Sequence, residues 1–208
     1  MCTPSLQPVP NQPGHYSAFN GMPALSVAAQ RIAAQQGESD ETRADAYCVL
    51  SYLEICNRPR DTKAAMKAMK RAVALRPNSG LQLDHRAALH SMDGDFASAL
   101  ADLTRARTLH EGPHAALLKH EATGNIGKCL RQLNRGQQAM VELERYVEEA
   151  ISGQIVLTDR ERGHVVVAEY MLVELLGNNG NRATRMLRAA SPPPQPLSGI
   201  RPAHSASL

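Results

Sequence analysis

The chain has 208 residues, a formal net charge of +3, 3% aromatic residues and no tryptophan. No apolar run approaches the roughly 20 residues needed to cross a bilayer, and the amino terminus lacks the pattern of a secretory signal, so neither is predicted. The four cysteines, Cys2, Cys48, Cys56 and Cys129, have no paired metal-binding spacing and no disulfide framework. This usage predicts reduced, buried thiols in a cytoplasmic protein.

Prolines gather at the two ends of the chain. Of the thirteen, five lie in Met1–Pro23 and five in Pro192–Pro202. Both ends are also poor in large apolar groups, so they cannot bury enough surface to offset the entropy of ordering. We therefore expect disordered tails over residues 1–22 and 191–208, around a helical domain over residues 23–190.

The first predicted element is a helix over residues 23–36, PALSVAAQRIAAQQ. It precedes two segments that repeat each other, and arrays of stacked repeats need a covering element at each end. The helix is therefore interpreted as a cap on the first repeat or, alternatively, as the second half of a degenerate repeat.

Two segments match each other at a spacing of 34 residues. The matched positions have the same size class; they are Asp61, Ala65, Met69, Ala72 and Leu75 in the first segment and Asp95, Ala99, Leu103, Ala106 and Leu109 in the second. A fixed period of this length indicates stacked helix-turn-helix units, in which small side chains let two helices approach closely. Ala72 and Ala106 are therefore expected to be buried at helix contacts.

The small residues of both segments, the turn at Gly94-Asp95-Phe96 and the helix-ending Pro77 resemble the tetratricopeptide repeat. The resemblance implies an all-α fold, a helix-turn-helix repeat solenoid of about three and a half to four repeats. The repeats would span about residues 42–77, 80–110, 113–152 and 158–190. The sequence departs from the family pattern at Glu111, which replaces a proline, and at Arg86 and His90, which replace bulky residues.

The third repeat is out of phase, because Ala139 follows Ala99 by 40 residues and six residues are added around Gly112-Pro113. In this repeat Tyr146 takes a place where the family has a small residue, so the helix contact there must differ. The fourth repeat begins with Thr158-Asp159-Arg160-Glu161, which has the form of a helix-capping box.

Within the fourth repeat, the β-branched run Val165–Val167 is open to interpretation as a strand, but its place after a cap favours a helix. A turn over Asn178–Asn181 would then precede a last helix that carries Ala183 and Leu187.

In the tetratricopeptide family the first helices of successive repeats line a concave groove, and the resemblance carries the ligand-facing positions onto this chain. These are Tyr47, Leu50, Ser51, Glu54, Asn57 and Arg58 in the first repeat, Leu81, Asp84, His85 and Ala88 in the second, and Glu121, Asn125, Lys128 and Arg131 in the third. One subfamily grips the carboxy-terminal carboxylate of heat-shock chaperones with lysine, arginine and asparagine side chains. Leu50, Glu54, His85, Glu121 and Asn125 occupy those places here, so the clamp's positive charge is missing and such an adaptor is not expected.

The basic segment Arg58–Arg76 offers a different surface. Its Lys63, Lys67 and Lys70 are spaced to share one helix face. The face is interpreted as a solvated outer surface or, alternatively, as a docking stripe for an acidic protein, a phosphorylated segment or a nucleic acid backbone. No base-stacking aromatic residues are interleaved with these charges, which disfavours nucleic acid.

No cofactor and no metal site is predicted. His110, His114 and His120 gather near the added residues, but Gly112-Pro113 separates the first two and the last two are six residues apart, so they share no helix face. No nucleophile or phosphate-binding motif accompanies them, and an enzyme is not expected.

The sequence is interpreted as a non-enzymatic adaptor or scaffold that holds a peptide or partner protein in the concave groove of a repeat solenoid. One alternative is a dedicated chaperone or regulator of a secretion-type client, although such proteins usually have a more apolar and aromatic groove than Tyr47 and Leu50 provide. A second alternative is a nucleic-acid-associated regulator that uses the basic helix over residues 58–76. No membrane partner is expected.

Overall fold

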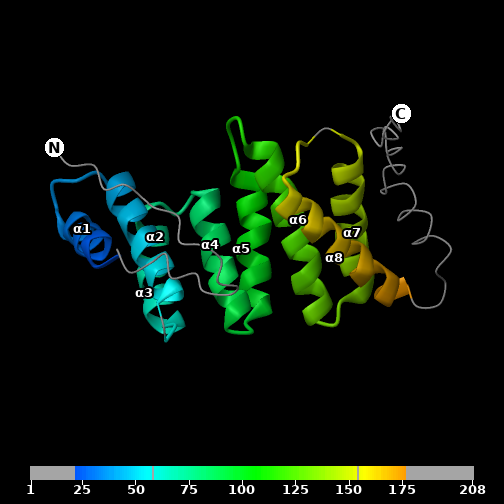
Figure 1. Cartoon of the computed structure of the whole chain (residues 1–208), viewed down its shortest axis with the longest axis horizontal. Helices are drawn as coiled ribbons and strands as arrows, with labels where there is room; N and C mark the ends of the chain where they lie inside the picture. The colour runs from blue at the N-terminus through cyan, green and yellow to red at the C-terminus, as the bar shows by residue number, and fades with distance from the viewer. Residues whose placement is uncertain (1–21, 58, 154, 177–208) are drawn as a thin grey trace, which may run out of the picture. The chain divides into compact units, whose positions relative to one another are not determined.

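The computed structural model describes residues 22–57, 59–153 and 155–176, and the regular structure of these residues is helical, with no strand among them (Figure 1). The prediction of an all-α fold is confirmed. The chain divides into two compact units, Met1–Pro77 and Asn78–Leu208. The domain predicted over residues 23–190 thus spans two units, and its outer boundaries stay a prediction.

The described part of unit 1 consists of α1 (Met22–Ala34), α2 (Asp40–Cys56) and α3 (Thr62–Leu75), each packed against the next. Ser39 begins α2 as an N-cap, because its hydroxyl accepts a hydrogen bond from the backbone N–H of Thr42 at 3.1 Å. The contact between α2 and α3 is rich in alanine, with Ala44, Ala65 and Ala72 fully buried. Small side chains at such a contact let two helix backbones lie close together.

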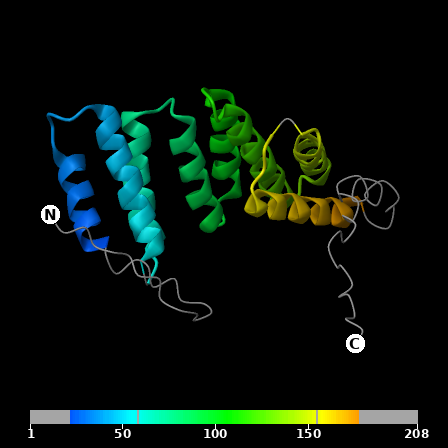
Figure 2. The same ribbon diagram turned by 45° about the horizontal axis from the view of Figure 1, so that its top comes forward.

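The described part of unit 2 consists of α4 (Gly80–Met92), α5 (Phe96–Leu109), α6 (Ala115–Gln132), α7 (Gly136–Ile151) and α8 (Asp159–Leu176). The first four helices pack each against the next, whereas α8 crosses α6 and α7 at an angle (Figures 1 and 2). Gly94 and Asn134, with φ angles of 79° and 58°, form the left-handed turns after α4 and α6. Glycine and asparagine are the residues that adopt this conformation most easily.

The 34-residue match corresponds to a shared helix plan in α3 and α5. Both helices have 14 residues, and α5 begins and ends 34 positions after α3 (62 to 96 and 75 to 109). Asp61 and Asp95 cap the two helices, accepting hydrogen bonds from the backbone N–H three residues on at 2.8 and 3.1 Å. Ala72 and Ala106 are both 0% exposed, which confirms their predicted burial.

The contact between α6 and α7 is arranged differently from that between α4 and α5, because the large Tyr146 stands where the repeat pattern has a small residue. Gly124 of α6 lies against the Tyr146 ring, where an added Cβ atom would come within 2.8 Å of a ring carbon. The ring also stacks on His120, with centroids 4.1 Å apart and planes inclined by 13°. A glycine on the first helix therefore supplies the space that a small residue on the second helix would otherwise provide.

The last described helix begins with the predicted capping box. The backbone N–H of Thr158 donates to the Glu161 carboxylate, and the backbone N–H of Glu161 donates to Oγ1 of Thr158 at 3.4 Å. Val165–Val167 lie inside α8, so the helical interpretation is confirmed. The remaining predictions lie outside the described residues: the tails other than Met22, Cys2, Arg58, the Asn178–Asn181 turn, and the helix carrying Ala183 and Leu187.

Candidate partner-binding site

A hollow of about 400 Å³ opens between α4 and α6 in unit 2. Its polar lining residues include Asp84 of α4 and Asn125 and Lys128 of α6. Its apolar lining includes Phe96 and Leu103 of α5 and Met171 of α8. An apolar interior edged by polar groups is the arrangement that accepts an anchoring side chain of a protein partner.

Four of the eight predicted groove residues of unit 2 line this hollow, Ala88 among them. Asp84, Asn125 and Lys128 line it together, and Lys128 Nζ donates to Oδ1 of Asn125 at 3.3 Å. The other four are placed differently: Leu81 and His85 are exposed on α4, Glu121 is half-buried on α6, and Arg131 makes an ion pair with Glu174 of α8 beside a separate hollow. The repeat phase therefore brings together residues of α4 and α6 that are about 40 positions apart in the sequence.

The predicted groove residues of unit 1 lie together on α2. Tyr47, Leu50 and Glu54 are half-buried, whereas Ser51 is 3% exposed and is closed to a ligand. Tyr47 is already engaged, because the Arg71 guanidinium lies 5.6 Å above its ring and donates to its hydroxyl at 3.3 Å. A binding role for these four residues stays a prediction.

Asp84 has an unusual environment for a carboxylate. Its Oδ2 lies 2.7 Å from Nε2 of the buried His110, but this approach lacks hydrogen-bond geometry, and Oδ1 is buried with no hydrogen-bond partner among the residues that the structure describes. Burial, with a smaller contribution from the negative charge of Glu121, raises the pKa of Asp84 to about 7. Burial also lowers the pKa of His110, so the imidazole does not supply a positive charge at neutral pH.

Lys128 is the cation of the hollow. Burial lowers the pKa of its ammonium, although the nearby Glu121 carboxylate acts in the opposite direction. The hollow thus presents an incompletely neutralised acid and a partly desolvated base on facing helices. Charged groups in such a setting fix the orientation and register of a bound segment more than they add affinity.

The sequence did not identify Met171, Phe96 and Leu103 as lining residues. Phe96 and Leu103 belong to the second helix of a repeat, which the family pattern assigns to the convex side. Met171 reaches the hollow because α8 crosses α6 instead of continuing the stack (Figure 2). No sequence periodicity reports this crossing.

Ion pairs hold the helices around the hollow in position. Arg86 of α4 makes two hydrogen bonds with Asp102 of α5, at 2.7 and 2.6 Å, and the bonding raises the pKa of the Arg86 guanidinium. This pair explains why an arginine stands at a position where the family has a bulky residue. A bidentate pair of this kind fixes both side chains and so orients α4 against α5.

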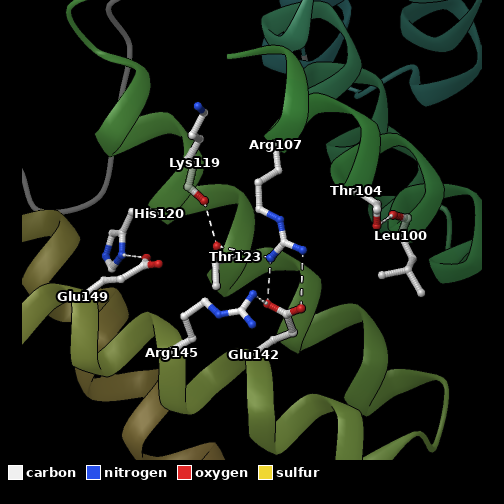
Figure 3. A network of polar contacts seen from close by, with 9 residues as sticks. All are labelled: Leu100, Thr104, Arg107, Lys119, His120, Thr123, Glu142, Arg145 and Glu149. Atoms are coloured by element: carbon white, nitrogen blue, oxygen red, sulfur yellow. Dashed lines mark hydrogen bonds and ion pairs between the residues drawn. The ribbon is translucent and has the colours of Figure 1, made fainter. Parts of the chain in front are cut away.

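A polar network links α5, α6 and α7 on another side of unit 2 (Figure 3). Arg107 and Arg145 both approach the Glu142 carboxylate, at 2.7 and 3.1 Å, and Arg107 also donates to Thr123. In the same region His120 Nδ1 lies 3.1 Å from Glu149. These contacts tie α5, α6 and α7 together.

Within residues 22–57, 59–153 and 155–176, no group of three or more His, Cys, Asp and Glu side chains is arranged to hold a metal ion. None of the helices in that part of the chain is both long enough and apolar enough to span a bilayer. Cys48, Cys56 and Cys129 are free thiols, and burial raises the pKa of Cys48 to about 11.

Two crystal structures of the "putative kinesin light chain nearly identical TPR-like repeats" of Podosopora anserina are similar to this chain. One of them, a point variant, has a TM-score of 0.56 and 14% identity, and the other has a TM-score of 0.54 and 15% identity; each match covers 81% of this chain and 92% of that one. At this identity the likeness shows the fold alone, a tetratricopeptide-like repeat fold, which confirms the predicted fold class. No protein-family model matches the chain, and no curated protein matches it either.

Proposed function

We propose that this chain is a non-enzymatic protein-binding module that holds a segment of a partner protein in the hollow between α4 and α6. The observation that carries the proposal is the meeting of Asp84, Asn125 and Lys128, from two helices, around an apolar interior of about 400 Å³. An apolar side chain of the partner would enter this interior, and polar groups on either side of it would pair with the charged lining.

The composition of the hollow supports a selective adaptor over a chaperone that shields an extended apolar client. Among the residues that the structure describes, Phe96 is the one aromatic side chain that lines it, and it is half-buried. A surface that covers a long apolar client needs a broad apolar patch, whereas a short polar-edged hollow suits one anchor and its neighbours. The free thiols, with the pKa of Cys48 and that of Cys129 both raised by burial, fit the reducing cytoplasm, where we place the protein.

The test uses the full chain and peptides selected on it from a random display library. We expect a selected peptide to bind at least about tenfold more weakly to Asp84→Lys and to Lys128→Glu, because a reversed charge facing a partner costs several-fold to many-fold in affinity. The matched controls are Glu148→Lys and Arg160→Glu, which make the same charge changes at exposed positions of α7 and α8. These controls should bind like the parent chain.

Either of two results would overturn the proposal. In the first, selected peptides bind both hollow variants as tightly as the parent. In the second, the control variants lose as much affinity as the hollow variants, which would show that net charge and not the hollow governs binding. Circular dichroism of each variant checks that its helices are intact.

A further inference from the structure

α3 carries an exposed row of positive charge on the face opposite its buried residues. Lys63, Lys67 and Lys70 make up this row, and none of them forms an ion pair with any residue that the structure describes. In the same unit Arg43 and Arg76 are paired with acidic residues of α2. The lysine row is therefore a surface whose charges have no partner among the described residues.

Comparison with α5 shows that the fold does not need this charge. α5 has the same length and the same aspartate cap as α3, and four of the five positions buried in α3 are also buried in α5. The residues of α5 that correspond to the lysine row, 34 positions further on, are Ala97, Ala101 and Thr104, and all three are exposed. One helix of this chain is thus built on the same plan with a neutral outer face.

α7 supports the same conclusion. Counting from its buried Ala139 in place of Ala65, the positions equivalent to the lysine row are Gln137, Val141 and Glu144. Three helices that share one buried pattern therefore carry three different outer faces, and the face of α3 alone is uniformly basic. A feature that varies while the framework stays constant points to binding rather than to folding.

We infer that the lysine row is a docking face for an acidic helical segment of a partner protein, separate from the hollow of unit 2. Lysines at i, i+4 and i+7 place their charges along about 10 Å of one helix side, at 1.5 Å per residue. A partner helix with carboxylates at the same spacing presents them along the same length and can pair all three. Ala74, exposed one turn beyond Lys70, leaves space for the approach of the partner backbone.

A protein segment fits this face better than a nucleic acid does. α3 has no aromatic side chain on which a base could stack. Tyr47, which lies close to α3, has its ring and its hydroxyl occupied by Arg71. Lysine also binds as a point charge, so it lacks the planar fork with which arginine reads phosphate groups.

The test is a nitrogen-15 NMR titration of the full chain with three probes at low salt. The first probe is an alanine-based helical peptide with glutamates at i, i+4 and i+7, the second has the same composition with the glutamates spread over all helix faces, and the third is a single-stranded oligouridine. The key variant is Lys63→Ala with Lys67→Ala and Lys70→Thr, which copies the outer face of α5 and so should fold. The control is Lys119→Ala with Arg135→Ala and Arg160→Ala, which removes the same charge from exposed positions of unit 2.

The expected result is that the patterned peptide shifts the amide signals of α3 in the parent and in the control. The copied-face variant should lose at least about tenfold in affinity, and the spread peptide should bind at least about threefold more weakly than the patterned one. The inference is overturned if oligouridine binds α3 more tightly than the patterned peptide, if the control loses as much affinity as the copied-face variant, or if the patterned peptide leaves the α3 signals unchanged.

The hollow variants Asp84→Lys and Lys128→Glu should bind the patterned peptide like the parent. The outcome of this titration is therefore independent of the outcome of the peptide selection.

Discussion

The helix contact around Ala106 and the helix contact around Tyr146 both have a glycine on the first helix but differ in the residue that the second helix presents. At the first contact the second helix contributes the small Ala106, and Gly80 of the first helix lies opposite, where an added Cβ atom would come within 3.2 Å of the Ala106 carbonyl oxygen. At the second contact the second helix contributes the large Tyr146, and Gly124 of the first helix receives the ring. At both contacts a ring therefore lies against a glycine of the first helix, His110 against Gly80 and Tyr146 against Gly124, although the two rings stand at different positions of the repeat.

Each contact also buries a histidine next to a carboxylate, and here the two helices do exchange roles. His110 follows the second helix and meets Asp84 of the first, whereas His120 belongs to the first helix and meets Glu149 of the second. The two pairs differ in geometry: His120 and Glu149 are placed to form a hydrogen bond, whereas His110 and Asp84 are not. The comparison teaches that the repeat conserves fit between two helices and not the residue type at any one position.

The largest expected effect comes from removing the ring that fills the second contact. Tyr146→Ala should lower the free energy of unfolding by roughly 3–5 kcal/mol, because it leaves a cavity beside Gly124 and removes the stacking partner of His120. Urea denaturation followed by circular dichroism measures this loss. An unfolding midpoint equal to that of the parent would show that the ring does not support the contact.

The next effect comes from overfilling the first contact. Ala106→Leu should cost about 1–3 kcal/mol, because the side chain at this position is 0% exposed and has no space into which to grow. Ala101→Leu is the matched control on the exposed face of the same helix and should change stability by less than about 0.5 kcal/mol. Equal losses in both variants would contradict the assignment of Ala106 to the helix contact.

A smaller effect is expected at the glycine that makes room for Tyr146. Gly124→Ala should cost about 1–2 kcal/mol in the parent, because the new methyl group would lie 2.8 Å from the ring. In the Tyr146→Ala background the same change should stabilise by up to about 1 kcal/mol, since the clash is gone and alanine favours a helix over glycine.

Gly163→Ala is the control for this double-mutant cycle. Gly163 lies in α8 with no atom within 4 Å of an added Cβ, so the substitution should stabilise by about 1 kcal/mol in both backgrounds. If Gly124→Ala behaved like Gly163→Ala in the parent, Gly124 and Tyr146 would not be coupled.

The sequence predicted the framework because the framework depends on local patterns. The buried Ala72 and Ala106 and the capping box at Thr158 are set by spacings within one helix or one repeat. The meeting of α4 and α6 residues in one hollow also followed, since the repeat phase decides which helix face looks inward.

The sequence did not predict the compensating glycine or the crossing of α8. Tyr146 indicated that its contact had to differ, but Gly124 lies 22 positions before it, and only the register of two packed helices pairs them. Similarly, the approach of Asp84 to His110 depends on how the end of α5 packs against α4. Pairings of this kind arise from tertiary geometry, which a single sequence does not encode as a period.

The last and smallest effect tests the buried carboxylate of the first pair, Asp84 beside His110. Burial raises the pKa of Asp84 from 3.8 to about 7, so between these values the folded chain keeps a proton that the unfolded chain releases. The stability that this proton provides is complete below pH 3.8, falls as the pH rises, and is lost above about pH 7. Asp84→Asn, which has no charge to bury, should therefore match the stability of the parent at about pH 4. At about pH 8 its free energy of unfolding should exceed that of the parent by about 1 kcal/mol, a figure reduced for the 22% exposure of the Asp84 side chain.

Asp102→Asn is the matched control: it breaks the bidentate pair with Arg86 and should be less stable than the parent at both pH values. Urea denaturation at the two pH values measures the difference, and a gain from Asp84→Asn that is the same at both would show that Asp84 does not carry the unpaired charge.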